Sequence, residues 1–395
     1  NPPYMGSSGM DGNLKIWGKD NYINSKSDLF AMFIERNLDL AQEHGMIAMI
    51  TMQSWMFLSS YESLRKNILE HTTILTMAHL GTRAFDSIGG AVVSTTSFVL
   101  EKSKQLNFEG SFLRLLDGKT ELEKESAMLE AVKNPNCGWL FITSTSDLMK
   151  LPGFPIAYWV SESLIHTFSA NPSINDFSHT FQGIITGNND FFLRYWYEIS
   201  ISKISRDLVS FADVQGIKTW ILYSKGGDFR KWYGNNEHIL RWNGYGDDLT
   251  RGRTENRQYF FRHGITWSDI ATGKPSFRYQ PKSILFDAKS PTSFYEHEGF
   301  KNIIALLNSK FIEKLAPLLN PTMSFQIEDY NRIPLKDGIL SSEQVAKVTK
   351  NAIKYSESDW NSYETSWNFT TLPLLAPDYR EPTLERTYQR LLDHW

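Results

Sequence analysis

The chain has 395 residues, of which 41% are apolar and 14% aromatic, so it is long enough for two or three domains with their own cores. This composition excludes an intrinsically disordered chain, and a net charge of −3 excludes a protein that is basic over its whole surface. One cysteine, Cys137, excludes a disulfide framework and a cysteine-based zinc site, and it fits a reducing cytoplasm.

The first four residues, Asn1-Pro2-Pro3-Tyr4, form a motif typical of enzymes that methylate a planar nitrogen. An exocyclic amine such as adenine N6 is a poor nucleophile, because its lone pair is delocalised into the ring. Two neighbouring hydrogen-bond acceptors, one for each N–H group, pull the nitrogen toward tetrahedral geometry and free the lone pair. The Asn1 side-chain oxygen and the Pro2 carbonyl can be these acceptors, and the prolines hold them in place because they fix φ. The Tyr4 ring can stack on a base rotated out of a duplex. The alternative is a Pro-rich turn with an exposed tyrosine.

Alternating helices and strands are predicted after the motif. Apolar residues at three-to-four spacing indicate a helix that Ser27 caps and that runs from Asp28 to Gly45. A continuous apolar run at 46–51 then predicts a strand covered on both faces. A further helix and two strands are expected at 59–69, 73–78 and 93–100. This order is typical of a doubly wound α/β sheet, whose ligands bind at the carboxyl ends of the strands, where the first four residues would lie.

The pattern becomes aromatic-rich and punctuated by glycine near residue 151, so we place a domain boundary there. Charge is segregated beyond it, because residues 218–289 hold about thirteen Lys and Arg against about seven Asp and Glu. The alternative is a solvated loop with an ordinary charge mix. Candidate contacts with phosphates and base edges are Lys225, Arg230, Lys231, Trp232 and Asn235, followed by Arg251, Arg253, Arg257 and Arg262.

Helices are expected again in the last quarter of the chain. Residues 303–315 have the pattern of an amphipathic helix, residues 341–356 have helical composition, and a short helix is expected at 384–392. We therefore predict three regions, at 1–150, 151–340 and 341–395: the C-terminal half of a doubly wound Rossmann-like sheet, an α+β recognition domain, and a helical spacer with a tail.

Longer strings along the chain are far more specific than the first four residues alone. The strings are NPPYMGSSGM at 1–10, SDLFAMFIERNLDLAQEHGMIAMIT at 27–51, PIAYWVSE at 155–162, YSKGGDFRKWYGNN at 223–236, GITWSDI at 264–270, LLNPTMSFQIEDYNRIPL at 318–335 and SDWNSYETSWNF at 358–369. With them the chain resembles the γ-type N6-adenine DNA methyltransferases, and more narrowly the PglX-like methylases of BREX phage-defence systems.

The resemblance implies roles for particular residues and for a cofactor. Asn1, Pro2 and Tyr4 would hold the target amine, and Phe85 matches the loop aromatic that covers the other face of the flipped base in γ-type methylases; an ordinary core phenylalanine is the alternative. In that family the half that binds S-adenosylmethionine precedes the Asn-Pro-Pro-Tyr motif, and no substitute for its Gly-rich motif occurs here. We therefore expect an internal fragment of a larger methylase, inactive by itself.

The leading interpretation is part of a site-specific DNA adenine-N6 methyltransferase in phage defence, with double-stranded DNA and other defence proteins as partners. A DNA-recognition or scaffold module without catalysis is the second class. A glutamine-N5 or ribosomal-RNA guanine methyltransferase ranks lower, because a large basic and aromatic region would have no purpose in such compact enzymes. The nine histidines are scattered and no apolar run nears the roughly 18 residues of a membrane span, so we expect no metal and no membrane partner, in a cytoplasmic protein.

Overall fold

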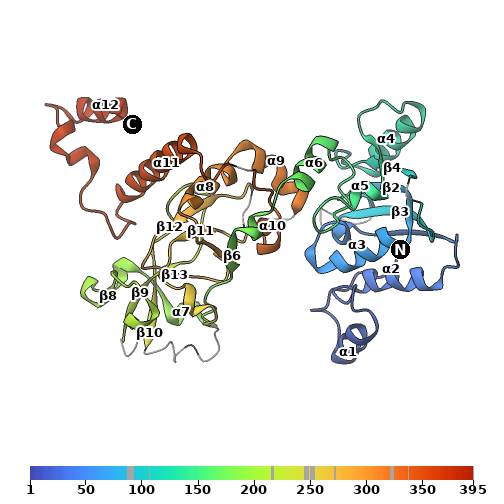
Figure 1. The fold of residues 1–395 in the computed structure, drawn as a ribbon, viewed down its shortest axis with the longest axis horizontal. Coiled ribbons are helices and arrows are strands. Elements are labelled where there is room, and N and C mark those ends of the chain that lie inside the picture. Colours follow the sequence, from blue (N-terminus) through green and yellow to red (C-terminus); the bar gives the residue numbers. More distant parts are fainter. Residues whose placement is uncertain are drawn as a thin grey trace. The chain divides into compact units, whose positions relative to one another are not determined.

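The computed structural model describes residues 1–86, 93–105, 107–214, 218–243, 249, 254–270, 273–320, 324–336 and 338–394 (Figure 1). Two compact units divide the chain. Unit 1 consists of Asn1–Asn171 and Leu318–Pro321, and unit 2 of Pro172–Pro317 and Thr322–Trp395. In the part of the chain described here, no helix is both long enough and apolar enough to cross a membrane.

Unit 1 alternates helices and strands around one sheet. Its helices are α1 (Gly12–Asn21), α2 (Leu29–Leu40), α3 (Glu62–His71), α4 (Glu121–Lys133), α5 (Thr145–Leu148) and α6 (Glu162–Ala170). Its strands are β1 (Met46–Met52), β2 (Thr73–Gly81), β3 (Thr95–Glu101), β4 (Glu109–Arg114) and β5 (Leu140–Ser144). The α/β fold class expected from the sequence is confirmed.

The strands of unit 1 form a mixed sheet in the order β1-β3-β2-β4-β5. Strand β3 lies between β1 and β2 and runs antiparallel to both, so Phe98 is paired with Met49 on one side and Met77 on the other. Strands β2 and β4 are parallel, and β5 returns antiparallel along β4. The two strands that flank β3 therefore point the same way, and their carboxyl ends share one edge of the sheet.

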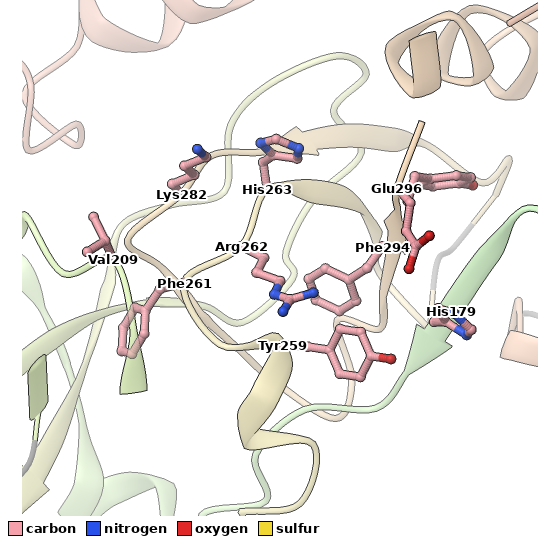
Figure 2. A pocket seen from close by; sticks show the side chains of 10 residues that line it. His179, Val209, Tyr259, Phe261, Arg262, His263, Lys282, Phe294 and Glu296 are labelled. Carbon is pink, nitrogen blue, oxygen red and sulfur yellow. The ribbon is translucent and has the colours of Figure 1, made fainter. Parts of the chain in front are cut away.

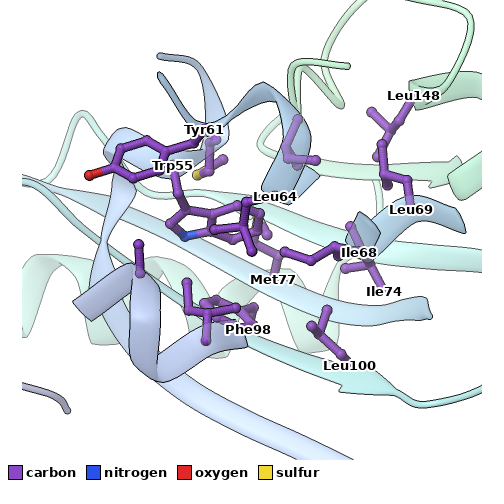
Figure 3. Packing of buried hydrophobic residues seen from close by; sticks show 14 of the residues in the cluster. Trp55, Tyr61, Leu64, Ile68, Leu69, Ile74, Met77, Phe98, Leu100 and Leu148 are labelled. Atoms are coloured by element: carbon purple, nitrogen blue, oxygen red, sulfur yellow. The ribbon is translucent and has the colours of Figure 1, made fainter. Parts of the chain in front are cut away.

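The core of unit 1 forms where α2 and α3 pack against this sheet (Figure 3). Phe30 and Ile34 of α2 and Leu64 and Ile68 of α3 are fully buried, as their three-to-four spacing predicts. Trp55, in the turn between β1 and α3, stacks edge-on against Phe98 at 5.1 Å between ring centroids. Each of these large apolar side chains contributes about 2 kcal/mol through its burial.

Two local predictions for unit 1 are wrong. The first helix predicted after the motif, α2, was expected to be capped by Ser27 and to end at Gly45. It is capped by Asp28, whose carboxylate accepts a hydrogen bond from Phe30 N, and it ends at Leu40. The strand at 46–51 is not covered on both faces, because its residues alternate between buried Ile47 and exposed Met46 and Ala48. The reason is the packing of its two faces: Ile47 joins the core that α2 helps to form, whereas Met46 and Ala48 lie on the opposite face and are exposed.

The described residues of unit 2 form two further sheets. The first has the order β13-β9-β10-β7, with β8 also paired to β9, and the second has the antiparallel order β12-β11-β14-β6. The strands are β6 (Ser178–Phe181), β7 (Leu193–Tyr195), β8 (Ile204–Ser205), β9 (Lys218–Ser224), β10 (His238–Asn243), β11 (Gly264–Trp267), β12 (Phe277–Gln280), β13 (Leu285–Phe286) and β14 (Thr292–Tyr295).

The helices of unit 2 surround and follow these sheets. They are α7 (Asn189–Phe192), α8 (Lys301–Leu307), α9 (Lys310–Leu319), α10 (Ile327–Asn331), α11 (Glu343–Asn361) and α12 (Leu384–His394). The helix predicted at 303–315 is interrupted, because Asn308 uses its side-chain amide to bond both backbone groups of Phe277 on β12. The helices predicted at 341–356 and 384–392 correspond to α11 and α12. The three-region division at 150 and 340 stays a prediction.

Candidate functional site

The first four residues hold their polar groups together. The hydroxyl of Tyr4 donates a hydrogen bond to Asn1 Oδ1 at 2.8 Å, so the amide of Asn1 has its oxygen turned toward the tyrosine. Pro2 is buried, whereas Asn1 and Pro3 are exposed. Because a carbonyl oxygen has two lone pairs, Asn1 Oδ1 can accept a second hydrogen bond from a bound amine.

The ring of Tyr4 is held by the first residues of α2. It packs edge-on against Phe30, with 6.0 Å between ring centroids and 85° between the planes. Partial burial raises the pKa of the Tyr4 hydroxyl above its ordinary value, so the group stays protonated and remains a donor at neutral pH. The tyrosine therefore fixes the orientation of the Asn1 amide without carrying charge.

Asp28 connects this segment to the core of unit 1. One carboxylate oxygen accepts hydrogen bonds from Met5 N at 3.0 Å and from Phe30 N at 3.3 Å, so the same side chain caps α2 and holds the residue after Tyr4. The backbone adds Leu29 N to Met5 O and Ser7 N to Ser27 O. This role of Asp28 was not predicted, although an aspartate at the first position of the amphipathic pattern was the available signal.

Phe85 is half-buried in the loop after β2. Its neighbour Asp86 is tied to the start of α4, since Asp86 N donates to Glu121 Oε1 at 2.7 Å and Glu121 N donates to Asp86 Oδ1 at 3.3 Å. Among the described residues, no ring contact joins Phe85 to Tyr4. The role of Phe85 against a flipped base therefore stays a prediction.

The segment 225–236 in unit 2 holds five of the residues predicted to contact DNA. Lys225 lies 3.6 Å from the carboxylate of Asp287, which is 5% exposed and also accepts a hydrogen bond from the hydroxyl of Tyr223. This contact links β9 to the turn that follows β13. The ammonium of Lys225 is thus opposite a buried negative charge of its own unit.

Arg230 and Lys231 also have partners inside unit 2. The guanidinium of Arg230 is 3.2 Å from Asp359 and lies 4.8 Å over the ring of Trp360, both on α11. The ammonium of Lys231 is 3.0 Å from Glu313 on α9 and donates to Asn308 O at 2.8 Å. These two cations join the segment to the helices that follow the second sheet.

The end of the segment has an unusual backbone. Trp232 and Asn235 have φ angles of 72° and 58°, and Trp232 forms a bridge with Arg278 on β12. Asn235 is 4% exposed, and its amide donates to Asp228 O at 2.8 Å. A Cβ on Gly234 would lie 2.8 Å from Arg230 Cδ and 3.0 Å from the Trp360 ring, so only glycine allows this close approach.

The remaining predicted DNA contacts lie beyond the segment. Arg251 and Arg253 fall outside the described residues. Arg257 is half-buried in a short 3₁₀ helix, where its guanidinium donates to the backbone and hydroxyl oxygens of Thr254. Arg262 is exposed near the start of β11. Contact of these residues with DNA stays a prediction.

Within the described ranges, no three His, Cys, Asp or Glu side chains gather closely enough to hold a metal ion. The sequence also has no G-x-G-x-x-G loop, the usual glycine pattern of a dinucleotide-type cofactor site.

Comparisons with known proteins agree along the chain. Residues 1–85 match the family model of the Eco57I restriction-modification methylase. The chain is 41% identical over 405 residues to the adenine-specific methyltransferase PglX of Lacticaseibacillus casei (strain Zhang), covering 99% of this chain and 33% of that protein. It is 38% identical over 383 residues to the adenine-specific methyltransferase BrxX of Escherichia coli O9:H4 (strain HS), covering 95% of this chain and 30% of that protein.

Two solved structures share the fold. The Type ISP restriction-modification enzyme LlaGI, solved as a nuclease-deletion mutant in complex with a DNA substrate mimic, matches with a TM-score of 0.52 and 14% identity, over 97% of this chain and 37% of that chain. The Type IIL restriction-modification enzyme MmeI in complex with DNA matches with a TM-score of 0.51 and 11% identity, over 99% of this chain and 52% of that chain. The chain belongs to the family of PglX and BrxX adenine-specific methyltransferases, and it spans about a third of the length of these curated relatives.

Proposed function

We propose that this chain is the base-holding and DNA-recognition part of a site-specific DNA adenine-N6 methyltransferase of the phage-defence type. The observation that carries the proposal is the 41% identity to an adenine-specific methyltransferase over 99% of the chain, beginning at an Asn-Pro-Pro-Tyr motif whose Asn1 and Tyr4 are hydrogen-bonded. Duplex DNA is the proposed substrate, the cytoplasm the proposed compartment, and other phage-defence proteins the proposed partners.

The chemistry of the motif follows from its geometry. Asn1 Oδ1 would accept one N–H of the flipped adenine amine and Pro2 O the other, which moves the N6 lone pair out of the ring. Tyr4 fixes the orientation of Asn1 Oδ1, whose second lone pair would accept from the amine, and its ring offers a face on which the base can stack, with Phe85 proposed for the other face. Catalysis is then mostly positioning for direct in-line transfer.

The methyl donor is proposed to be S-adenosylmethionine, which supplies an electrophilic methyl group. Its binding contacts are assigned to no residue of this chain, because the sequence lacks the Gly-rich loop expected of such a site. We place that site in the parts of the relatives that this chain does not match. What this chain contributes is the orientation of the acceptor amine and the recognition of the duplex.

The test is sequencing of N6-methyladenine in a host that carries the full-length protein. Asn1→Ala is expected to abolish the methylated sites, and Tyr4→Phe to reduce them without changing the recognised sequence, because it frees the Asn1 amide but keeps the ring. Asn13→Ala, an exposed asparagine on α1, is the matched control and should leave the pattern unchanged. Methylation by the Asn1→Ala protein equal to that of the wild type would rule out the proposed clamp.

DNA binding separates catalysis from recognition. A gel shift with the Asn1→Ala protein should show the same duplex affinity as the wild type, because the acceptor of the amine lies in unit 1 and the proposed recognition surface in unit 2. If the wild-type protein binds duplex sequence-specifically but never methylates adenine, the chain is a recognition module without catalysis.

A further inference from the structure

A cavity of about 390 Å³ opens on unit 2, and the described residues that line it lie outside the segment 225–236 (Figure 2). Residues of β6 and β14 line it, together with the chain from Tyr259 to His263 that leads into β11. Ligand pockets in proteins measure about 300–1,000 Å³, so this cavity has the size for one small ligand of about mononucleotide size.

One wall of the cavity is aromatic. Tyr259 and Phe294 have their ring centroids 5.0 Å apart with 30° between the planes, and Phe294 is 3% exposed. The guanidinium of Arg262 lies 5.4 Å over the Tyr259 ring, which supports one of its faces. Because a guanidinium is planar, its other face offers a flat cationic surface on which a base can stack.

The cations of this cavity have no ion-pair partner among the described residues. Arg262 and Lys282 are both exposed, and neither lies within ion-pair distance of a carboxylate in the part of the chain that the structure describes. His263 adds no charge at neutral pH, because burial and the nearby Lys282 and Lys301 lower its pKa. Two positive charges therefore face the opening, and the cavity's own carboxylate, Glu296, forms no ion pair with either of them among the described residues.

The cavity also carries charged groups of opposite sign on its two sides. Figure 2 shows Lys282 and Glu296 on opposite sides of the lining, with Arg262 between them. A ligand that fits this order has an anionic group at one end, a planar ring in the middle and a hydrogen-bond donor at the far end. Nucleotides whose base carries an exocyclic amine have these three features in that order.

We propose that this cavity binds a nucleotide, with its phosphate at Lys282, its base stacked on the Arg262 guanidinium, and the exocyclic amine of the base donating to Glu296. Adenine and cytosine nucleotides are favoured over thymine, which has no such amine. The nucleotide has two possible sources, a free mononucleotide or an unstacked residue of a DNA strand, and both present the same chemistry. The proposal does not depend on methyl transfer.

Isothermal titration calorimetry on the intact protein tests this site with 2′-deoxyadenosine 5′-monophosphate, deoxyadenosine and 2′-deoxythymidine 5′-monophosphate. Lys282→Gln should weaken the deoxyadenosine monophosphate about tenfold and leave deoxyadenosine unchanged, because only the phosphate loses its partner. Arg262→Gln should weaken both. Glu296→Gln should reduce the preference for the adenine over the thymine nucleotide. Lys310→Gln, an exposed lysine on α9, is the charge-matched control and should change nothing.

A second titration identifies the source of the nucleotide. It uses a duplex with one unpaired adenosine and the same duplex fully paired. Binding of the free nucleotide that depends on Lys282 indicates a soluble ligand, whereas binding only of the duplex with the unpaired base indicates a strand nucleotide. If no probe distinguishes the wild type from folded Arg262→Gln and Lys282→Gln proteins, as judged by circular dichroism, the cavity is not a nucleotide site. The Asn1→Ala methylation test is unaffected by that result.

Discussion

The segment 225–236 and the cavity beside Tyr259 are both positively charged, but their cations have different neighbours. In the segment, Lys225, Arg230 and Lys231 each face a carboxylate of unit 2. In the cavity, Arg262 and Lys282 face solvent and an open volume of about 390 Å³. Both regions place Lys and Arg beside aromatic residues, so residue types alone do not tell a structural cation from one available to a ligand.

The comparison predicts opposite mutational behaviour. Removing a partner of a segment cation should cost stability, because these contacts hold β9, α9 and α11 together. Removing a cavity cation should leave stability unchanged and alter binding.

The largest effect is expected for Asp287→Ala. Asp287 is 5% exposed and accepts hydrogen bonds from Tyr223 Oη at 2.5 Å and Lys289 N at 2.7 Å, besides pairing with Lys225. The variant should lose about 3 kcal/mol of unfolding free energy, because it leaves a partly buried ammonium without a counter-charge. Urea denaturation measures this. Glu255→Ala, an exposed carboxylate, should stay within about 0.5 kcal/mol of the wild type.

A smaller effect is expected for the pair of Arg230 and Asp359. Their side chains are 34% and 38% exposed, so solvent weakens the attraction. A double-mutant cycle with Arg230→Ala and Asp359→Ala should give a coupling energy of about 0.5–1 kcal/mol. A cycle between Arg230→Ala and Glu343→Ala, at the other end of α11, should give a value near zero. Equal coupling in the two cycles would contradict the specific pairing.

Glu313, the carboxylate partner of Lys231, makes a pH-dependent contribution to the free energy of unfolding. Hydrogen bonds from Lys274 at 2.7 Å and Lys231 at 3.0 Å lower the pKa of Glu313 to about 2. The unfolded chain then binds the proton more tightly, so the stabilising effect is present above pH 4.5 and is lost as the pH falls toward 2. Urea denaturation at pH 5 and pH 3 should show a smaller difference between wild type and Glu313→Gln at the lower pH. A constant difference would show that the lysines do not hold the carboxylate.

The smallest effect on stability is expected in the cavity. Arg262→Gln and Lys282→Gln should each change the unfolding free energy by less than about 0.5 kcal/mol, because neither cation has an ion-pair partner among the described residues. Thermal denaturation of both variants checks this. A loss comparable to that of Asp287→Ala would mean that these cations are structural as well, and the distinction between the two regions would disappear.

Much of the fold could be predicted from sequence because its signals are local. The apolar spacing from Phe30 to Leu38 predicted α2, and the runs at 46–51, 73–78 and 93–100 predicted three strands of the first sheet. What failed depended on tertiary contacts. Residues 301–319 form two helices instead of one because Asn308 bonds to β12, and β1 has an exposed face because only its other face packs into the core of unit 1.

In the candidate sites, too, the features that depend on tertiary contacts were not predicted from the sequence. The motif at residues 1–4 was predicted because its chemistry is contained in four consecutive residues. The state of the basic side chains was not predicted, since the partners of Arg230 and Lys231 lie 129 and 82 residues further along the chain. Asp28 was missed because its second role, bonding Met5 N, joins residues 23 apart.

The position of β3 between β1 and β2 has a consequence for synthesis of the protein. Both flanking strands are complete when Gly81 has been added, but their shared partner ends at Glu101. At about 5–20 residues per second, a ribosome needs roughly one to four seconds to add the 20 residues that follow Gly81 up to Glu101. During that interval β1 and β2 have been synthesised but lack their shared partner β3. A translational pause between the codons for residues 81 and 101 would prolong the time in which these unpaired strands can aggregate or bind chaperones.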